Sequence, residues 1–359
     1  MRILHVMASL DPASGGPIEA VRRLAAGYRE AGHEAEVATL DDPEAVYLKD
    51  APLPVHAHGP AKGKYGYSPK LLPWLRENIS RFDGVVVNGL WQYHGLAAWR
   101  ACEGRVPYAV FTHGMLDPWF KRRYPLKHAK KWPYWALVEY RLLRDAERVL
   151  FTSETEQRLA AESFWLHKWR GEVVPYGTPG PAGDADALKA AFYARCPGLE
   201  GRRFLVYLGR IHEKKGCDLL VEAFGRVAGD DPELHLLVAG PDQVGWMKDL
   251  RATVARLGVD GRVYWPGMLV GDAKWGAMYA SEAFILPSHQ ENFGISVAEA
   301  LACGRAVLIS DKINIYAEIE KDGAALVEED TMNGTERLLR RWLALDGAER
   351  ARMGAAARR

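Results

Sequence analysis

The sequence predicts an α/β protein made of two doubly wound domains, each with a parallel sheet covered by helices. Short apolar runs alternate with amphipathic helical stretches along both halves of the chain, and this alternation is typical of parallel sheets. The length of 359 residues exceeds that of one ordinary domain. A segment rich in Pro and Gly, residues 178–184, separates the two series. We therefore expect residues 1–178 and 179–359 to form separate domains.

Composition narrows the class of protein. With 47 Lys and Arg against 46 Asp and Glu, the formal net charge is +1, so no nucleic-acid partner is implied. The four cysteines are scattered without metal-like spacing, which is typical of reduced thiols inside a cell. They are Cys102, Cys196, Cys217 and Cys303. The sequence has no run of about 18 apolar residues and no signal-peptide pattern at its start. A cytoplasmic protein without a membrane-spanning helix is expected.

The first half of the chain contains apolar runs that predict strands, at residues 3–8, 36–40, 85–89, 108–112 and 148–151. Helices are expected over residues 18–31 and 94–102, and another behind Ser153 as its cap. Residues 42–73 are rich in Pro, Gly and His without a clear period, and we interpret them as a loop with short elements.

A glycine pair, Gly15 and Gly16, lies in the loop between the first predicted strand and the first predicted helix. Strand, glycine loop and helix together form the phosphate-binding turn of a doubly wound sheet. The loop lacks the G-x-G-x-x-G pattern of dinucleotide-binding folds. The pair alone therefore indicates either a ligand loop or a plain strand–helix turn.

The second half repeats the alternation, with strands predicted at residues 204–208, 234–239, 263–265, 283–286 and 306–309. The segment after the fourth of these runs, residues 287–305, is the most informative in the chain. Pro287 stops the strand, residues 292–294 form a turn signal, and a short helix follows until Gly304. The first turn of a helix that follows such a loop binds anions, because its N–H groups and dipole favour negative charge.

Two carboxylates flank this anion-binding position. Glu291 lies in the loop just before the helix, and Glu299 lies about one turn inside it. The arrangement suits two hydroxyl-bearing groups with a diphosphate between them, which is the layout of a nucleotide sugar. The alternative is a pair of solvated glutamates at the two ends of a surface helix.

The pattern P-S-x-x-E-x-F-G-x-x-x-x-E-A-x-A-x-G over residues 287–304 resembles the retaining glycosyltransferases of the GT-B fold, family GT4. The resemblance implies two Rossmann-like domains with parallel sheets facing a central cleft. It implies that Glu291 accepts hydrogen bonds from the donor sugar and Glu299 from the ribose. Backbone amides of Asn292, Phe293 and Gly294 would lie against sugar and phosphate.

A second cluster, residues 207–216, matches the G-R-x-x-x-x-K-G pattern of the same family. The resemblance implies that Gly209 opens the loop and that Arg210 and Lys215 bind the donor diphosphate. These cations would neutralise the charge that develops on the leaving group. Because the sequence has no D-x-D motif in a suitable loop, we expect no metal and no cofactor, with the nucleotide diphosphate sugar as donor substrate. The alternative is a solvated basic loop.

His113 follows a predicted strand in the run F-T-H-G-M-L-D-P-W. Most single histidines are structural, but the carboxyl end of a parallel strand is where ligands bind. The resemblance implies that His113 contacts the transferred sugar and that Gly16 lets backbone N–H groups approach the donor phosphate or the acceptor. It also implies a front-face reaction in which the donor phosphate takes the acceptor proton.

The acceptor side is indicated by aromatic residues mixed with cations: Trp119, Lys121, Arg122 and Arg123, with a second patch at residues 164–170. Such a mixture suits an anionic membrane surface or a lipid diphosphate. The alternative is an exposed basic helix with its aromatic face in the core. The wording H-G-M-L-D-P-W resembles GT4 members of bacterial surface-polysaccharide pathways, which implies a polyprenyl-diphosphate-linked or growing glycan acceptor at the inner membrane surface.

The leading hypothesis is a retaining, metal-independent hexosyltransferase of surface-polysaccharide biosynthesis. A nucleotide-sugar epimerase or a glucan-synthase-like enzyme on the same fold is the first alternative. A non-catalytic sugar-nucleotide-binding subunit would be expected to lack one of the four charged candidates, and none is missing. The absent G-x-G-x-x-G argues against an NAD-dependent oxidoreductase. GT4 chains usually continue into an aromatic helix that crosses back to the first domain. This sequence stops at Arg359, so the expectation is either that the chain is cut there or that the helix is absent.

Overall fold

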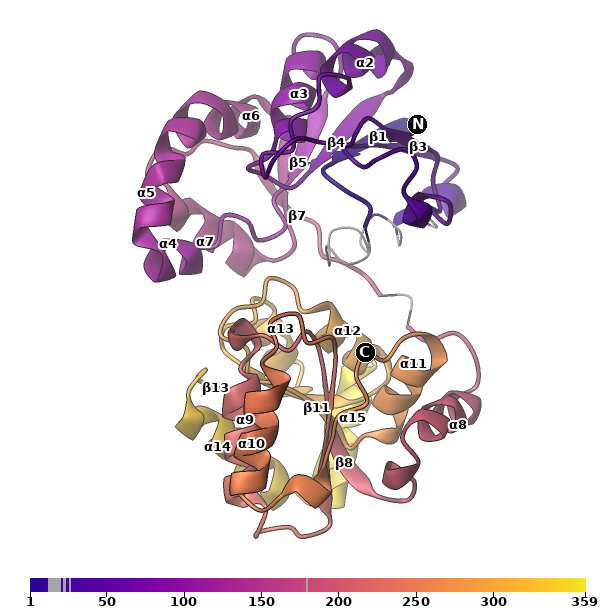
Figure 1. The fold of residues 1–359 in the computed structure, drawn as a ribbon, viewed down its shortest axis with the longest axis vertical. Helices are drawn as coiled ribbons and strands as arrows, with labels where there is room; N and C mark the ends of the chain where they lie inside the picture. The colour runs from indigo at the N-terminus through magenta and orange to yellow at the C-terminus, as the bar shows by residue number, and fades with distance from the viewer. Residues whose placement is uncertain (12–20, 22–23, 26, 179) are drawn as a thin grey trace. The chain divides into compact units, whose positions relative to one another are not determined.

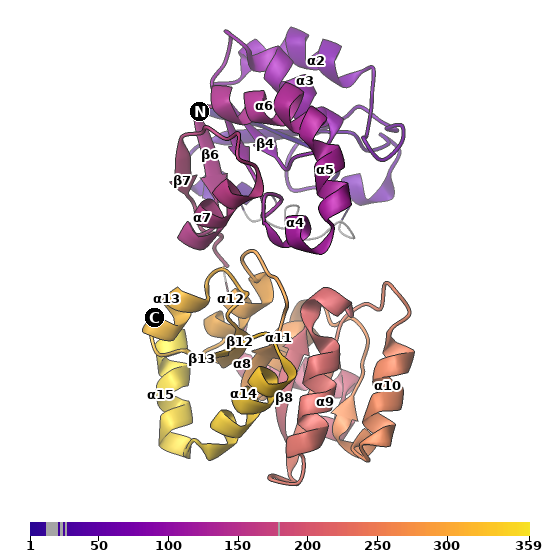
Figure 2. The same ribbon diagram turned by 90° about the vertical axis from the view of Figure 1, so that its left-hand side faces the viewer.

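The computed structural model describes residues 1–11, 21, 24–25, 27–178 and 180–359. The chain divides into two compact units, Met1–Tyr176 (unit 1) and Gly177–Arg359 (unit 2). Figures 1 and 2 show that each unit is a sheet covered by helices on both sides. The predicted fold class is confirmed, because both sheets are parallel and alternate with helices along the chain.

Unit 1 contains a seven-stranded sheet in the order β3-β2-β1-β4-β5-β6-β7, with every pairing parallel. Its strands are β1 (Arg2–Met7), β2 (Glu34–Thr39), β3 (Val55–Ala57), β4 (Gly84–Asn88), β5 (Tyr108–Phe111), β6 (Arg148–Phe151) and β7 (Gly171–Val173). The central strands are buried on both faces, as expected for a parallel sheet between two helical layers: the consecutive residues His5 and Val6 of β1 are both fully buried.

The helices of unit 1 are α2 (Leu71–Asn78), α3 (Tyr93–Cys102), α4 (Trp119–Arg123), α5 (Pro125–Tyr134), α6 (Tyr140–Asp145) and α7 (Glu154–Ser163). A π-helical turn, Trp135–Glu139, joins α5 to α6, and short 3₁₀ turns cover Val46–Leu48 and Ile79–Arg81. The Ser153 hydroxyl accepts a hydrogen bond from the backbone N–H of Glu156, so the predicted cap begins α7.

Unit 2 contains a six-stranded parallel sheet in the order β10-β9-β8-β11-β12-β13. Its strands are β8 (Arg203–Leu208), β9 (Leu234–Ala239), β10 (Val263–Tyr264), β11 (Ala283–Leu286), β12 (Ala306–Ser310) and β13 (Ala325–Glu328). All of β9, β11 and β12 is buried. The order reverses between β8 and β11, which is the position where doubly wound sheets bind ligands.

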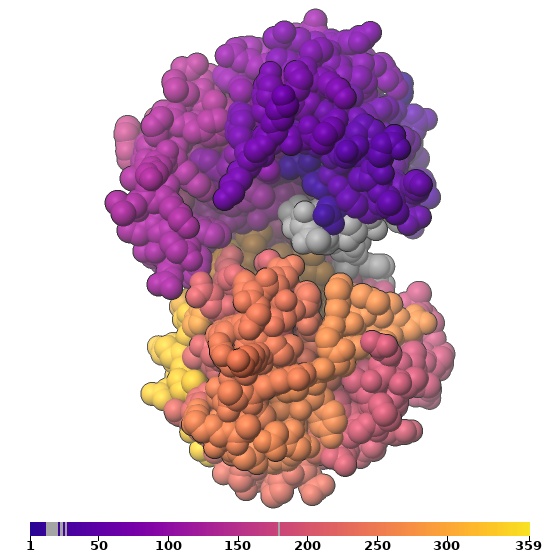
Figure 3. Space-filling model, in the orientation of Figure 1, coloured from indigo at the N-terminus to yellow at the C-terminus, as the bar shows by residue number. Residues whose placement is uncertain are grey.

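The helices of unit 2 are α8 (Ala185–Arg195), α9 (Cys217–Val227), α10 (Met247–Arg256), α11 (Gly271–Ala280), α12 (Ile295–Ala302), α13 (Tyr316–Lys321), α14 (Met332–Ala344) and α15 (Gly347–Ala357). Short 3₁₀ turns cover Pro197–Leu199, Glu213–Lys215 and Asp260–Arg262. The segment around α10, in orange, forms much of the visible face of unit 2 in Figure 3. In the described part of the chain, no helix is long and apolar enough to cross a bilayer.

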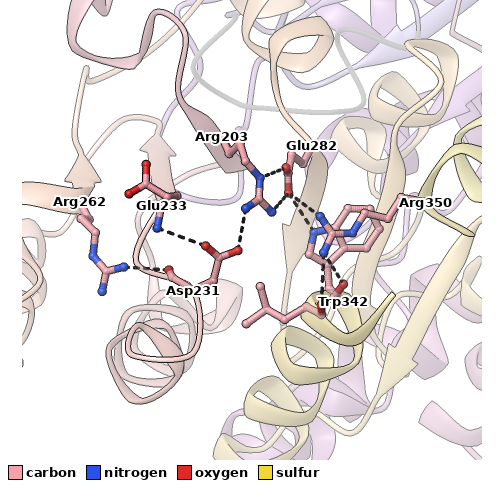
Figure 4. A network of polar contacts seen from close by, with 8 residues as sticks. Arg203, Asp231, Glu233, Arg262, Glu282, Trp342 and Arg350 are labelled. Atoms are coloured by element: carbon pink, nitrogen blue, oxygen red, sulfur yellow. Dashed lines mark hydrogen bonds and ion pairs between the residues drawn. The ribbon is translucent and has the colours of Figure 1, made fainter. Parts of the chain in front are cut away.

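The amino end of the unit 2 sheet is held by a charged network (Figure 4). Arg203 at the start of β8 donates to Glu282 (2.5 Å) and to Asp231 (2.8 Å). Glu282, just before β11, also accepts from the Trp342 indole (3.4 Å) and from Arg350 (3.3 Å). The network thus ties α14 and α15 to the end of the sheet opposite the ligand-binding edge.

The structure adds three strands that the sequence did not predict, namely β3, β7 and β13. They have three or four residues each, and β3, β7 and β13 lie at the edges of their sheets. Such short edge strands have little apolar pattern to detect. Of the helix expected over residues 18–31, residues 21, 24–25 and 27–31 are described; all of these are helical except residue 31, which lies in a turn.

Candidate active site

The candidate site residues of unit 2 other than Glu299 lie in the segments that follow β8 and β11, at the carboxyl end of the sheet. Gly209 and Arg210 directly follow β8, and Pro287 directly follows β11. Because β8 and β11 are neighbours at the point where the strand order reverses, these two loops form the position where doubly wound folds bind phosphate groups.

Lys215 and Glu291 are in direct contact, Nζ against the carboxylate, and join the two loops. Their side chains are 14% and 21% exposed. Burial, with Lys214 and Arg210 adding to it, lowers the pKa of Lys215 to about 7. The carboxylate of Glu291 favours the ammonium form. An arriving diphosphate would favour it further, because it brings additional negative charge.

The two loops also fit together through their backbones. The Lys214 carbonyl accepts from the His289 N–H (2.9 Å) and from the Ser288 hydroxyl (2.8 Å). Gly216 has a φ of 66°, and a Cβ there would lie 2.1 Å from the Pro287 carbonyl oxygen. The glycine that ends the G-R-x-x-x-x-K-G pattern is therefore required by close packing beneath Lys215.

Glu291 is anchored from both sides by the loop after β12. Its N–H donates to the Lys312 carbonyl (3.0 Å), and its carbonyl accepts from the Asn314 N–H (3.1 Å). The Asn314 amide also contacts Asn292 Oδ1 at 3.4 Å. Phe293 is 8% exposed, and Gly294, with a φ of 73°, leads into the first turn of α12.

Glu299 lies in the middle of α12, is 4% exposed and has a lysine partner. Lys274 Nζ of α11 donates to its Oε1 at 2.8 Å, while the same ammonium lies 4.4 Å from the Trp275 ring centroid. No local pattern in the sequence indicates Lys274, which precedes Glu299 by 25 residues.

Arg210 is exposed and donates to Gln243 Oε1 at 3.3 Å. Its carbonyl accepts from the buried Tyr207 hydroxyl at 2.8 Å. A Cβ on Gly240 would lie 1.7 Å from the Gly209 carbonyl oxygen, so the loops after β8 and β9 touch at their glycines. The guanidinium is thus exposed to solvent, where a ligand can reach it, while its backbone is held.

His113 lies just after β5 in unit 1, at the carboxyl end of that sheet. Its ring stacks on Phe111, with centroids 4.6 Å apart and planes 6° apart. Nε2 lies 3.1 Å from Asn88 Oδ1, and Nδ1 contacts the Tyr176 hydroxyl. Because an amide oxygen only accepts, Nε2 carries the hydrogen and Nδ1 accepts from the Tyr176 O–H.

The amide of Asn88 extends this arrangement to His5. Asn88 Nδ2 lies 3.1 Å from His5 Nδ1, whose Nε2 lies 3.0 Å from the Tyr28 hydroxyl. Burial, with His5 and His94 adding to it, lowers the pKa of His113 to about 3. The imidazole is therefore neutral at pH 7 and offers a lone pair at Nδ1.

Three residues around His113 were missed by sequence analysis: Asn88, Glu156 and Tyr176. Glu156 accepts hydrogen bonds from the backbone of Gly114 and from Thr112, on either side of His113. Asn88 ends β4, and a polar residue at the carboxyl end of a strand is a signal that could have identified it. Glu156 and Tyr176 carry no such signal.

The residues expected on the acceptor side lie on α4. Lys121 donates to the Glu162 carbonyl (3.1 Å), and Arg122 pairs with the Glu162 carboxylate (3.2 Å). The Trp119 ring packs edge-on against Tyr124, 6.0 Å between centroids, and the Arg123 guanidinium lies 5.8 Å from the same tyrosine ring.

Both interpretations of this aromatic and basic region find support. Trp135 is fully buried and stacks on Phe164 at 4.1 Å, so part of the aromatic face does belong to the core. Leu126, Leu137 and Trp165 are 80%, 61% and 78% exposed, and α5 lies at the outer edge of unit 1 in Figure 1. Exposed apolar side chains therefore occur in this region together with its cations.

The structure tests neither the role predicted for Gly16 nor metal independence. Gly16 lies outside the described residues. In the described ranges, no group of three or more His, Cys, Asp or Glu side chains is arranged to hold a metal ion. Metal independence stays a prediction.

Both halves of the chain match glycosyltransferase family models. Residues 15–177 match the model described as glycosyl transferase 4-like domain, and residues 196–359 match the model described as glycosyl transferases group 1.

Two curated relatives match over most of the chain. The chain is 25% identical over 350 residues to mannosylfructose-phosphate synthase of Agrobacterium fabrum, covering 87% of this chain and 75% of that protein. It is 27% identical over 321 residues to GDP-mannose:cellobiosyl-diphosphopolyprenol alpha-mannosyltransferase of Xanthomonas oryzae, covering 87% and 79%.

A solved structure shares the fold. Anabaena HepE in complex with UDP and glucose has a TM-score of 0.77 at 18% identity, covering 100% of this chain and 94% of that one. The two family matches and the two parallel α/β units agree with each other. The chain therefore belongs to the group 1 glycosyltransferases, family GT4, with the GT-B fold.

Proposed function

We propose that this glycosyltransferase moves a hexose, with retention of configuration, from a nucleotide diphosphate sugar to a lipid-linked or growing glycan. The observation that supports it best is the contact of Lys215 with Glu291, which joins the loops after β8 and β11. The contact brings a cation suited to a diphosphate and a carboxylate suited to sugar hydroxyls to the start of α12.

The diphosphate is proposed to lie against Arg210, Lys215 and the first turn of α12. Both cations come from the loop after β8, and the helix supplies N–H groups and the positive end of its dipole. Together they would stabilise the negative charge that develops as the bond between the sugar and the diphosphate breaks. In this proposal they replace a metal ion, and unchanged turnover in excess EDTA would support that.

The two glutamates are proposed to bind the two ends of the donor. Glu291 would accept from the hexose hydroxyls, and Glu299 from the ribose diol. Lys274 holds one oxygen of Glu299 at 2.8 Å, so it would fix the carboxylate in one orientation. That orientation makes Lys274 part of the proposed ribose end.

The reaction itself is proposed to follow the front-face course implied by the family. The bond between the anomeric carbon and the diphosphate oxygen breaks, and the acceptor oxygen bonds to the same face of that carbon. The acceptor proton passes to the departing phosphate oxygen. No side chain is required as nucleophile, so the protein contributes position and charge.

His113 is proposed to contact the hexose through Nδ1. The neutral ring accepts there, and Asn88 holds the opposite nitrogen at 3.1 Å. The Tyr176 hydroxyl contacts Nδ1 in the structure. A sugar hydroxyl would therefore replace Tyr176 as the donor to this atom.

The acceptor is proposed to be polyprenyl-diphosphate-linked, presented at a membrane surface. Exposed Phe120, Leu126, Leu137 and Trp165 lie among the cations of α4 and α5, a mixture that binds anionic lipid surfaces. The named acceptor of the Xanthomonas relative is itself a diphosphopolyprenol. Sedimentation with phosphatidylglycerol vesicles but not with phosphatidylcholine vesicles, weakened by Leu137→Asp and retained in Val46→Asp, would support this surface.

The experiment that tests the function is a thermal-shift screen with GDP-mannose, UDP-glucose and other nucleotide sugars, since ligand binding stabilises the folded protein. The stabilising donor is then incubated with a polyprenyl-diphosphate oligosaccharide, and the new linkage is assigned by NMR. A product with the donor's anomeric configuration is expected. An interconverted nucleotide sugar formed without any acceptor would instead indicate the epimerase alternative.

A further inference from the structure

His113 has an unusual backbone for its residue type. Its φ is 50°, and Gly114 follows with a φ of 74°. Among the described residues, Trp91 is the other non-glycine residue with a left-handed backbone. This conformation is energetically unfavourable for a residue with a Cβ, and it persists only where the surrounding structure holds it.

The carboxylate of Glu156 holds the turn at His113. Its Oε1 accepts from the Gly114 N–H and from the Thr112 hydroxyl, both at 2.6 Å. These donors come from the residues immediately before and after His113. The carboxylate therefore binds the residues on both sides of the histidine, through the Gly114 backbone and the Thr112 hydroxyl.

The other oxygen of Glu156 fastens the same carboxylate to a neighbouring strand. Oε2 accepts from the Thr152 N–H at 2.6 Å and from the Thr152 hydroxyl at 2.7 Å, just after β6. Glu156 itself lies in the first turn of α7 and is 4% exposed. A buried carboxylate is stable only with several donors and a favourable field, and the helix N-terminus adds to both.

A carboxylate suits this position better than any neutral isostere. Two backbone N–H groups, those of Gly114 and Thr152, approach opposite oxygens of Glu156. A glutamine amide accepts on one side only, so one of these N–H groups would meet an NH₂ group. Hydroxyls can rotate away from such a clash, but backbone N–H groups cannot.

The other left-handed residue is held in the same manner. Glu139, on the π-helical turn, is 1% exposed and accepts from the Trp91 N–H at 2.5 Å. The Trp91 indole donates to the Met115 carbonyl at 3.3 Å, within the loop that contains His113. Two buried glutamates thus support two adjacent strained turns at the carboxyl end of the unit 1 sheet.

We propose that Glu156 is a positioning residue for transfer: it holds the left-handed turn at His113 and so sets where the imidazole meets the donor sugar. This rests on the proposed function, in which His113 contacts the hexose. Glu156 contacts neither donor nor acceptor in this proposal, and it acts entirely through residues 112–114.

The test compares Glu156→Gln with Glu154→Gln, an exposed glutamate changed identically on the same helix. Glu156→Gln is expected to lower kcat by about 10- to 100-fold, because a displacement of about 1 Å has an effect of this size. Its affinity for the nucleoside diphosphate should stay unchanged, since the proposed diphosphate cations belong to unit 2. Glu154→Gln should match wild type in both measurements.

A double-mutant cycle distinguishes positioning from a general structural effect. In a His113→Ala background, Glu156→Gln should lower kcat less than about twofold further, because both changes remove the same contribution. The proposal would be overturned if the double variant lost kcat by the product of the two single-variant factors. It would also be overturned if Glu156→Gln had the kcat of wild type. If Glu156→Gln does not fold, Thr112→Val removes one grip on the turn and enters the same cycle.

A readout independent of turnover separates this inference from the proposed function. If wild type transfers no hexose from any donor tested, the proposed function fails. The imidazole ¹⁵N resonances of His113, assigned with His113→Ala, then decide the inference. They should shift in Glu156→Gln and not in Glu154→Gln, and unchanged resonances in both would overturn it.

Discussion

Each glutamate predicted to bind the donor is paired with a lysine in the structure. Lys215 contacts Glu291, and Lys274 donates to Glu299 at 2.8 Å. Both pairs are largely buried, where an unpaired charge would be costly. A diphosphate that binds Lys215 therefore competes with Glu291 for the same ammonium, and the two pairs give different expectations for the two glutamates.

Lys215→Ala should weaken donor and nucleoside diphosphate together. The change removes one cation from the proposed diphosphate site and leaves Glu291 there without its lysine partner. Losing a charge-assisted contact of this kind costs about 2–3 kcal/mol, or roughly 30- to 150-fold in affinity. Calorimetry with UDP and GDP measures it, with the surface variant Lys189→Ala as control. Wild-type affinity in Lys215→Ala would contradict the assignment.

Glu299→Ala and Glu291→Ala should differ in how they affect the nucleoside diphosphate product. Glu299→Ala should weaken it, because the proposed contact with the ribose would be lost. Glu291→Ala should leave its affinity intact or raise it, since Lys215 is freed from a competing carboxylate, yet it should depress kcat. A carboxylate near the anomeric carbon matters most as that carbon becomes cationic. Equal loss of product affinity in both variants would show that the two-ended assignment is wrong.

At the scale of elements, the candidate site depends on loops that approach within backbone contact. The turn Glu213–Lys215 rests against the loop after β11 through Gly216, and the loops after β8 and β9 touch through Gly240. Side chains on these glycines would separate the loops. The distance between Lys215 and Glu291 is therefore set by backbone packing as well as by their charges.

Gly216→Ala should destabilise unit 2 and weaken nucleoside diphosphate binding. Gly216 has a φ of 66°, and its new Cβ would collide with the Pro287 carbonyl. The matched control is Gly245→Ala, with a φ of 75° but open space around it. The control should lose only the backbone cost of about 1–2 kcal/mol. Chemical denaturation of both variants compares them, and equal losses would contradict the packing argument.

At the scale of the whole molecule, the two units contribute different chemistry. Unit 2 carries paired charges at the carboxyl end of its sheet. Unit 1 carries neutral histidines at the same end of its own sheet, because burial lowers the pKa of each: His5 and His94 to about 4 and His113 to about 3. These histidines stay neutral in the folded protein but bind protons in the unfolded chain below about pH 6.5. The stability of unit 1 therefore depends on pH.

Acid should therefore destabilise unit 1 below pH 6.5. His5 and His94 are 0% and 1% exposed, and burial lowers the pKa of each from 6.5 to about 4. Between these values the unfolded chain binds more protons, so stability is complete above pH 6.5 and is lost as the pH falls toward 4. One such histidine contributes a loss of about 2 kcal/mol between pH 7 and pH 5.

His94→Gln tests this prediction. The variant should be less stable than wild type at pH 7, because a buried hydrogen bond to the Asn88 carbonyl is altered. Its further loss of stability between pH 7 and pH 5 should nevertheless be about 2 kcal/mol smaller than that of wild type. The free energy of unfolding, measured in urea at both values of pH, provides the comparison. An equal loss in both proteins would contradict the assignment of His94 as a buried neutral group.

The sequence by itself determined the parts of this protein that are encoded locally. Apolar runs predicted the central strands, Ser153 predicted the start of a helix, and residues 287–304 predicted a strand stop, a turn and a short helix. Each of these patterns depends only on neighbours a few residues away. The same local patterns carried the resemblance to family GT4, and the family matches confirm it. Edge strands such as β3 and β13 were missed, since their register depends on the strands beside them.

Only the tertiary structure decided which polar groups of distant residues contact one another. Glu156 accepts a hydrogen bond from Gly114, 42 residues earlier in the chain. Lys274 donates to Glu299, 25 residues later, and Asn88 contacts His113, also 25 residues later. No local periodicity records such pairs, because parallel strands bring their carboxyl ends together only when the whole sheet forms. The left-handed backbone of His113 follows from the same fact, since a histidine adopts it only where distant groups hold the turn.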